Sequence, residues 1–451
     1  MKFGAYSEQI EDSMNQLFSA IFLEQKTIDK IRPPQTEKKI IQNNLTQEYA
    51  KLKGQNLVYD YMSSGRGHGP FTELVDGSVK YNLIGSMGVN LLGHSHPLYI
   101  RAHLEAAACD SFTCGNLLSY PDAYEFSKNL INSVQDSPLR HFWFSCSGSM
   151  ANDTALKILW QKMAPKRKII AFEKAFAGRT IAQQNITHNK AYSENMPDFV
   201  EVFHLPFYDL EHPQEAITKT LKDLDSLWEK EGDNFAALNI ELIQGEAGFI
   251  WGTEDYYKAI FKWAKEKNIL IWIDEIQTFA RTKKLFAFQM FGLQEYVDVV
   301  TIGKALQVCG TLYTDELNPK PGLIGGTFNS SIASIKVANK ILNYLTTGPF
   351  YGEDGRIALL EKEFLTRFLK IKVPEKIKNA RGIGSMISFE VGNSSADITK
   401  KFLNALFQNG IIAYSAGKNP TRIRFLLPLA LTDSHVNEIF SIIETTASEV
   451  L

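Results

Sequence analysis

The sequence predicts an α/β fold with a mostly parallel sheet of the seven-stranded type, joined to a smaller α+β domain. Short apolar runs alternate with amphipathic helices from residue 142 to residue 302, the pattern of parallel strands connected by helices. After about residue 330 helices precede short strands instead. The chain has 451 residues, too many for a single hydrophobic core, so two or three domains are expected.

The expected elements follow one another along the chain. Residues 1–55 are polar and predict helix and loop, broken by two prolines in the segment 31–34. In the large domain, strands are expected at residues 142–146, 168–172, 237–243, 269–273 and 297–302, and helices at 151–163 and 255–267. A long helical stretch over 332–344 and 357–369 then precedes strands at 386–391, 411–414 and 422–426.

This order of elements also predicts where the domains begin and end. Residues 1–75 are expected to form an N-terminal segment that contributes to the small domain. Residues 76–335 should form the large domain, and residues 336–451 the C-terminal part of the small α+β domain. The small domain would therefore be built from both ends of the chain.

Composition excludes several classes of protein. Apolar residues make up 44% of the chain and charged residues 22%, as in ordinary globular proteins. A net charge of −2 argues against nucleic-acid binding. No segment approaches the roughly 18–20 apolar residues of a membrane span, and no signal peptide is recognised. The four cysteines lack metal or redox spacing, so reduced thiols in a cytoplasmic protein are expected: Cys109, Cys114, Cys146 and Cys309.

Two of the expected strands deliver a charged residue to the same edge of the sheet. Asp274 follows the run 269–273, and Lys304 follows the run 297–302 after one glycine. This pair suits a pyridoxal phosphate site, in which the lysine forms an imine and the aspartate keeps the pyridine nitrogen protonated. A solvated acidic turn and an unrelated surface lysine explain these two segments equally well, because strand ends often carry charge.

Other loops carry weaker indications. Ser147, Gly148 and Ser149 join a strand to a helix and could cradle a phosphate, although an ordinary helix cap is the simpler interpretation. Phe176 could stack on a flat cofactor and Arg179 could bind a carboxylate, or both could be ordinary loop residues.

Three further segments carry equally weak indications. Glu246, among small residues, could be a mobile partner for an arginine. Thr327, in a glycine-rich turn, could contact a phosphate. His94 and His96 lack a nearby carboxylate or thiol at ligand spacing, so no metal site is expected.

The order and placement of these segments over residues 61–449 resemble the class III pyridoxal-phosphate aminotransferases of fold type I. This group includes the ornithine, acetylornithine, 4-aminobutyrate and lysine 6-aminotransferases. The most specific matching segments are Asp274-Glu275-Ile276-Gln277-Thr278-Phe279-Ala280-Arg281-Thr282 and Asp298-Val299-Val300-Thr301-Ile302-Gly303-Lys304-Ala305-Leu306.

The resemblance implies roles for these residues. Lys304 would be the Schiff-base lysine, and Asp274 would pair with the pyridinium nitrogen. The remaining cofactor contacts would come from Gln277 to the phenolic oxygen, Phe176 to the ring face, and Ser147, Gly148, Ser149 and the partner subunit's Thr327 to the phosphate. The active unit would then be a homodimer with shared active sites.

The resemblance also implies how substrates bind. Arg179 would hold the distal carboxylate of glutamate or 2-oxoglutarate, and Glu246 would mask Arg424 when the donor carries a terminal amine. Met150, Ala177 and a shortened 278–280 loop depart from the family pattern and leave the donor open.

The leading hypothesis is a ping-pong ω-aminotransferase that moves the terminal amino group of lysine, ornithine, 4-aminobutyrate or a similar donor to 2-oxoglutarate. A pyridoxal phosphate aminomutase, racemase or decarboxylase of the same fold is the alternative. A binding protein that keeps the cofactor without turnover is a third hypothesis.

Overall fold

The computed structural model describes residues 6–112, 118–329 and 331–451. It divides into two compact units. The central unit is Ala106–Leu359, and the terminal unit combines Met1–Glu105 with Leu360–Leu451. The terminal unit is thus built from both chain ends. The unit limits lie after Glu105 and Leu359, whereas the sequence suggested residues 75 and 335.

Both crossings between the units fall inside helices. Glu105 lies in α4 (Pro97–Ala107) and Leu359 lies in α12 (Arg356–Leu369). A continuous helix has no turn residues or change in composition at such a point. The sequence therefore contains no local signal for these limits.

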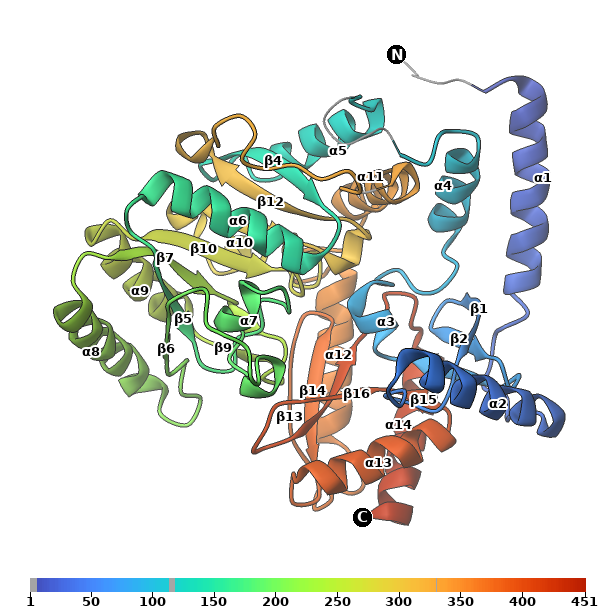
Figure 1. The fold of residues 1–451 in the computed structure, drawn as a ribbon. Helices are drawn as coiled ribbons and strands as arrows, with labels where there is room; N and C mark the ends of the chain where they lie inside the picture. The colour runs from blue at the N-terminus through green and yellow to red at the C-terminus, as the bar shows by residue number, and fades with distance from the viewer. Residues whose placement is uncertain (1–5, 113–117, 330) are drawn as a thin grey trace. The chain divides into compact units, whose positions relative to one another are not determined.

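The central unit contains a seven-stranded sheet (Figure 1). Every strand runs parallel to the others except β12, which is antiparallel to both of its neighbours. This arrangement confirms the predicted α/β sheet. The strand order is β4 (Leu139–Ser145), β12 (Cys309–Thr314), β11 (Val299–Ile302), β10 (Leu270–Glu275), β7 (Phe235–Ile240), β5 (Lys168–Phe172) and β6 (Val202–Leu205).

One helix covers the middle of this sheet. Leu156 and Leu159 of α6 (Gly148–Met163) are buried in the cluster that contains Ile169 of β5, Trp272 of β10 and Val299 of β11. Consecutive strand residues face opposite sides of a sheet, so these side chains can share one face. The packing fixes α6, and with it the loop at its N-terminus, over the carboxyl ends of the strands.

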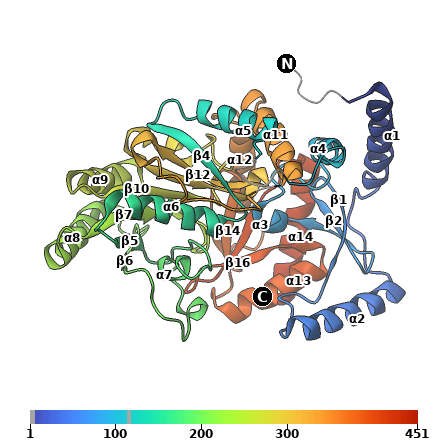
Figure 2. The ribbon, with the colours of Figure 1, turned by 45° about the horizontal axis from the view of Figure 1, so that its top comes forward.

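The other helices of the central unit form two pairs and several short segments. In both views α8 (Pro213–Glu231) and α9 (Glu254–Glu266) lie side by side, as do α5 (Pro121–Asn132) and α11 (Ile332–Thr347) (Figures 1 and 2). The short helices are α7 (Gln183–Ile186), α10 (Ala287–Met290) and the 3-10 turns η1 (Lys190–Tyr192), η2 (Gln294–Tyr296), η3 (Lys304–Leu306) and η4 (Asp315–Leu317).

The terminal unit contains two four-stranded sheets. The first has the order β1 (Ser63–His68), β2 (Phe71–Leu74), β3 (Val79–Asn82) and β15 (Ile411–Ile412). The second has the order β13 (Ile377–Ile383), β14 (Met386–Val391), β17 (Arg422–Leu426) and β16 (Tyr414–Ala416). Its remaining helices are α1 (Glu8–Gln25), α2 (Thr36–Lys53), α3 (Gly85–Gly88), α13 (Ala396–Gln408) and α14 (Asp433–Val450).

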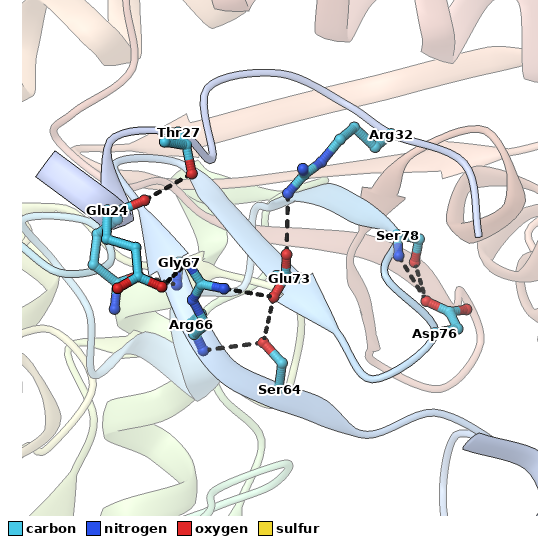
Figure 3. Close-up of polar contacts among 10 residues, drawn as sticks. Glu24, Thr27, Arg32, Ser64, Arg66, Gly67, Glu73, Asp76 and Ser78 are labelled. Carbon is cyan, nitrogen blue, oxygen red and sulfur yellow. Dashed lines mark hydrogen bonds and ion pairs between the residues drawn. The ribbon is translucent and has the colours of Figure 1, made fainter. Parts of the chain in front are cut away.

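The partly buried carboxylate of Glu73 links the N-terminal segment to the first of these sheets. Glu73 on β2 pairs with Arg32 at 3.0 Å and accepts a hydrogen bond from the Ser64 hydroxyl at 3.1 Å (Figure 3). Arg32 also exchanges backbone hydrogen bonds with Val79. The proline-containing break at residues 31–34 is therefore an extended segment bonded to β3 (Figure 3).

Two expected strands are divided in the structure. The expected strand 237–243 ends at Ile240, and Ile243 begins a separate strand, β8 (Ile243–Gln244), which forms a hairpin with β9 (Ile250–Trp251). The expected strand 411–414 is split at Ala413 between β15 and β16, which belong to different sheets. Apolar periodicity does not reveal such bends, because apolar residues stand on both sides of each bend.

Within the described ranges, no helix combines the length and the apolar character that crossing a bilayer requires.

Candidate active site

Asp274 and Lys304 come from adjacent parallel strands of the central unit. Asp274 is opposite Thr301 in the β10–β11 register, and Lys304 follows the end of β11. Asp274 is 4% exposed and lies close enough to Lys304 for the lysine charge to lower its pKa. The structure therefore brings the two predicted residues together at the carboxyl edge of the sheet, where ligands of open α/β sheets bind.

The carboxylate of Asp274 is held at both oxygens. Oδ1 accepts the backbone N–H of Ile276 at 2.9 Å, and Oδ2 accepts the side-chain N–H of Asn152 at 2.7 Å. Burial nevertheless raises the pKa of Asp274 to about 6, against the effect of these hydrogen bonds and of Lys304. A protonated pyridine nitrogen would supply the positive charge that this buried carboxylate requires.

Lys304 lies in a tight loop between β11 and β12. Ile302 pairs with Gly310 across the base of the loop, and the Gln307 N–H donates to the Lys304 carbonyl at 2.8 Å. Lys304 and Gln307 both adopt left-handed conformations, with φ of 51° and 62°. Such conformations are costly for residues other than glycine and concentrate at functional sites.

The N-terminus of α6 lies beside this pair. Ser147 caps the helix by accepting the Met150 N–H at 3.2 Å, so the interpretation as a helix cap is confirmed. A cap leaves the first helical N–H groups available to an anion, so the phosphate interpretation is compatible with it. A side chain at Gly148 would lie 2.9 Å from the Ile276 side chain, and one at Gly303 would lie 3.2 Å from it.

Two glycines therefore leave room for Ile276 between the helix start and the Lys304 loop. Close by, the Arg179 N–H donates to the Ser149 hydroxyl at 3.3 Å, and a side chain at Gly178 would overlap that hydroxyl. These small residues form a cradle in which a phosphate can approach the backbone. Together with Asp274 and Lys304, they fit pyridoxal phosphate.

Phe176 and Arg179 share a neighbour that the sequence did not indicate. The Arg179 guanidinium lies over the Tyr192 ring, 4.0 Å from its centroid, and Phe176 meets the same ring edge-on at 6.2 Å. Stacking of this kind orients a guanidinium while its N–H groups stay available. Tyr192 belongs to the 3-10 turn η1, which follows α7, and it is not part of any motif recognised in the sequence.

Gln277 and Glu246 are placed by the β8–β9 hairpin. Gln277 is buried, and its amide group packs so closely on Gly245 that a side chain there would force the amide to move. Glu246 follows in the hairpin turn and is half-buried. The hairpin thus lies beside the predicted partner of the cofactor's phenolic oxygen.

For two other predicted residues, the structure gives the local position only. Thr327 is exposed in a turn before α11. Arg424 belongs to the terminal unit, where it is fully buried on β17 with its guanidinium carbon 5.5 Å from the Tyr414 ring centroid. The structure does not place the two units relative to each other, so the Glu246–Arg424 pair stays a prediction.

Asn152 is the main residue that sequence reasoning missed. Its amide group donates to Asp274 and to the Ala177 carbonyl, both at 2.7 Å, and accepts the Thr301 hydroxyl at 2.7 Å. It therefore links α6, β10, β11 and the loop before Arg179. The sequence does contain an indication of its role, because Asn152 is an amide residue on the apolar face of the helix that also carries Leu156.

The histidine segment has a structural role. Both ring nitrogens of His94 lie near asparagine amides, at 3.0 Å from Asn82 and 3.4 Å from Asn90. Burial lowers the pKa of His94 to about 4, so the ring is neutral near pH 7. Among the residues that the structure describes, no His, Cys, Asp and Glu side chains form a group of three that could hold a metal.

Three cysteines are free thiols in the structure: Cys109, Cys146 and Cys309. Cys114 lies outside the described residues.

Comparison with known proteins gives a consistent result. The model of the family described as aminotransferase class-III matches residues 54–447. A putative [LysW]-aminoadipate semialdehyde/glutamate semialdehyde transaminase of Pyrococcus furiosus is 28% identical over 388 residues, which span 85% of this chain and 96% of that protein. Acetylornithine aminotransferase 1 of Bradyrhizobium diazoefficiens is 28% identical, with 85% and 92% covered.

A solved structure shows the same fold. Lysine aminotransferase from M. tuberculosis superposes with a TM-score of 0.79 at 20% identity, covering 90% of this chain and all of that one.

The buried carboxyl groups predict how stability depends on pH. Burial raises the pKa of Glu241 to about 8, of Glu275 to about 7 and of Asp274 to about 6. The folded state binds these protons more tightly than the unfolded state. Proton binding therefore stabilises the folded state at low pH, and this contribution is lost as pH rises to the pKa values of the folded state. From about pH 5 up to the folded pKa of each group, the free energy of unfolding of the cofactor-free protein should fall by about 1.4 kcal/mol per pH unit for each group that is ionised only in the unfolded state, and the fall should level off above about pH 8.

Urea denaturation at a series of pH values measures this slope. Glu241→Gln should reduce it, because the group with the highest of the three pKa values is removed. A stability that stays level or rises over this range would contradict the assignment.

Asn152→Leu should weaken cofactor binding. The change removes the partner of Asp274 Oδ2, Thr301 Oγ1 and the Ala177 carbonyl at a buried site, and about 1.4 kcal/mol lost there raises the dissociation constant about tenfold. Titration of the cofactor-free protein with pyridoxal phosphate measures this. Thr301→Val, which removes one of these hydrogen bonds, is the matched control and should have a smaller effect. Unchanged affinity in Asn152→Leu would show that Asp274 does not depend on this amide.

Proposed function

Because this chain belongs to the class III aminotransferases, pyridoxal phosphate enzymes that move an amino group from an amine donor to a keto acid, we propose that it is an ω-aminotransferase acting on a donor with a terminal amine. The acceptor is 2-oxoglutarate, and the two substrates react in turn at one site. The observation that carries the proposal is the placement of Lys304 beside the buried Asp274, with the α6 cradle and Arg179 at the same edge of the sheet.

Different residues of the central unit would bind different parts of the cofactor. When bound, pyridoxal phosphate withdraws electrons from the substrate carbon and accepts its amino group. Asp274 keeps the pyridine nitrogen protonated, and Gln277 binds the phenolic oxygen. Phe176 covers one ring face, and the backbone and hydroxyl groups of Ser147, Gly148 and Ser149 bind the phosphate.

Lys304 has two roles in this proposal. It first carries the cofactor covalently through its amine. With the cofactor and donor bound, the Lys304 amine would also move a proton from the donor carbon to the cofactor side. The left-handed backbone at Lys304 fixes the start of the side chain, which limits the positions its amine can reach.

Three charged residues select the substrates. Arg179, oriented by Tyr192, binds the distal carboxylate of 2-oxoglutarate in a bidentate manner. Glu246 pairs with Arg424 while a terminal-amine donor is bound. The pair separates when glutamate or 2-oxoglutarate binds, so that Arg424 can hold the α-carboxylate without ever burying an unpaired charge.

The names of the relatives support the class of donor. The names of the relatives contain acetylornithine, lysine and aminoadipate semialdehyde, compounds with a carboxylate at one end of a carbon chain and an amine or aldehyde at the other. Lysine, ornithine, 4-aminobutyrate and acetylornithine are the donors to screen in single turnovers. Formation of glutamate from 2-oxoglutarate separates an aminotransferase from an aminomutase, racemase or decarboxylase.

The proposed active form is a homodimer in the cytoplasm, in which the partner subunit's Thr327 completes the phosphate site. The exposed position of Thr327 supports this, because an exposed turn is accessible to a second copy of the chain.

Lys304→Ala should abolish amino transfer and the visible absorption of cofactor held covalently by lysine. Loss of a group that both carries the cofactor and moves the proton should lower kcat by about a thousandfold or more. Absorption spectroscopy and glutamate formation measure the two effects. A Lys304→Ala protein with the wild-type spectrum and activity would refute the assignment of this lysine.

Mixed dimers test the shared site. Lys304→Ala and Thr327→Asp proteins should each be inactive, the second because its carboxylate repels the phosphate. After unfolding and refolding together in equal amounts, half of the dimers combine one of each chain and contain one intact site, so about a quarter of wild-type activity should return. Refolding each variant alone is the control. No recovery in the mixture would place Thr327 outside the partner's site.

A further inference from the structure

Glu241 is a buried acid at the bend between β7 and β8. It follows Ile240, the last residue of β7, and is 8% exposed. Burial and the negative charge of Asp274 raise the pKa of Glu241 to about 8. A buried acid without an ion-pair role is costly to retain, and none of the cofactor or substrate contacts proposed above uses it.

The two carboxyl oxygens of Glu241 serve two different loops. Oε1 accepts the backbone N–H of Phe176 at 2.9 Å, and Oε2 accepts the backbone N–H of Gly245 at 3.1 Å. The first loop follows β5 and carries the proposed ring-stacking residue. The second is the turn of the β8–β9 hairpin, whose base is the Gln244–Ile250 pair, and Glu246 is its next residue.

We propose that Glu241 is a positioning residue. By accepting one backbone N–H from each loop, it fixes the position of Phe176, which covers the cofactor ring, relative to Glu246, which pairs with Arg424. The inference rests on the proposed function, because it takes the roles of Phe176 and Glu246 from there. It predicts that a change at Glu241, which contacts neither substrate, alters which substrate the enzyme prefers.

The chemistry of the side chain explains why an acid stands here. A carboxyl group offers an acceptor at each of its two oxygens, whereas a glutamine of the same size offers one acceptor and one N–H₂ donor. In Glu241→Gln, one of the two loops would face a donor in place of an acceptor, and its buried N–H would lose its partner. The loop that is released shifts relative to the one that stays bound.

A neighbouring residue provides a matched control. Gln244 joins the same two segments, because its side-chain N–H donates to the Glu173 carbonyl at 2.8 Å. It is 1% exposed, but its side-chain hydrogen bond involves neither the Phe176 N–H nor the Gly245 N–H. Gln244→Met therefore removes a buried link of similar kind and leaves both Glu241 hydrogen bonds in place.

The test compares the two half-reactions of the holoenzyme. For wild type, Glu241→Gln and Gln244→Met, single-turnover rates are measured with the best wild-type amine donor and with glutamate, each over a range of concentrations. Glu246 is proposed to pair with Arg424 during the donor half-reaction alone. We therefore expect Glu241→Gln to change the ratio of the two specificity constants by about tenfold, and Gln244→Met to leave it within about twofold of wild type.

The absorption spectrum of the bound cofactor gives a second readout, since a displaced Phe176 ring changes the surroundings of the cofactor ring. If Glu241→Gln does not fold, Glu241→Asp replaces it. This variant keeps both acceptors on a shorter arm and should change the same ratio in the same direction by a smaller factor.

Two results overturn the proposal: a wild-type ratio and spectrum in the Glu241 variant that folds, or an equal change of the ratio in Gln244→Met. Failure of the proposed function has a different outcome, because the wild-type protein would then form no glutamate from 2-oxoglutarate with any donor.

Discussion

The proposed active site depends on one buried carboxylate at the end of a parallel strand. Asp274 is fixed by the backbone N–H of Ile276 and by the amide of Asn152, and the neighbouring parallel strand leads directly to Lys304. In a parallel sheet both strands end at the same edge, so a residue pair far apart in the chain meets without a special loop. The α6 helix packs on the same strands and brings its N-terminus to that edge.

The site also contains three carboxyl groups that are buried close together. Glu241, Asp274 and Glu275 are all buried, and the negative charge of Asp274 raises the pKa of both glutamates. Most of their oxygens accept backbone N–H groups, so the acids order the loops around them in addition to setting the charge. Binding a cationic ring beside Asp274 relieves part of this repulsion, which couples the affinity for the cofactor to the order of the surrounding loops.

The sequence predicted the strands, helices and site residues that depend on a local pattern of residues. The strands before Asp274 and Lys304 are continuous apolar runs, and the small residues after β4 predicted the start of α6. Asn152 and Tyr192 were not predicted, because their contacts join segments that only the folded chain brings together. The limits of the two units fall inside α4 and α12, where the sequence contains no local signal for them. The roles of Thr327 and Arg424 depend on a second copy or on the other unit, and neither sequence pattern nor one chain's coordinates determines them.

The pairing of β3 with β15 constrains the order in which the protein can be made. Tyr81 on β3 lies opposite Ile411, so the part of β3 beyond its Arg32–Val79 bridge stays unpaired on this edge until almost the whole chain has left the ribosome. The central unit is continuous in sequence and can fold while synthesis proceeds. The N-terminal strands must wait with an unpaired edge, which is a site for incorrect pairing between nascent chains. Truncated or prematurely terminated chains should therefore aggregate through β3 even when their cofactor-binding half is well formed.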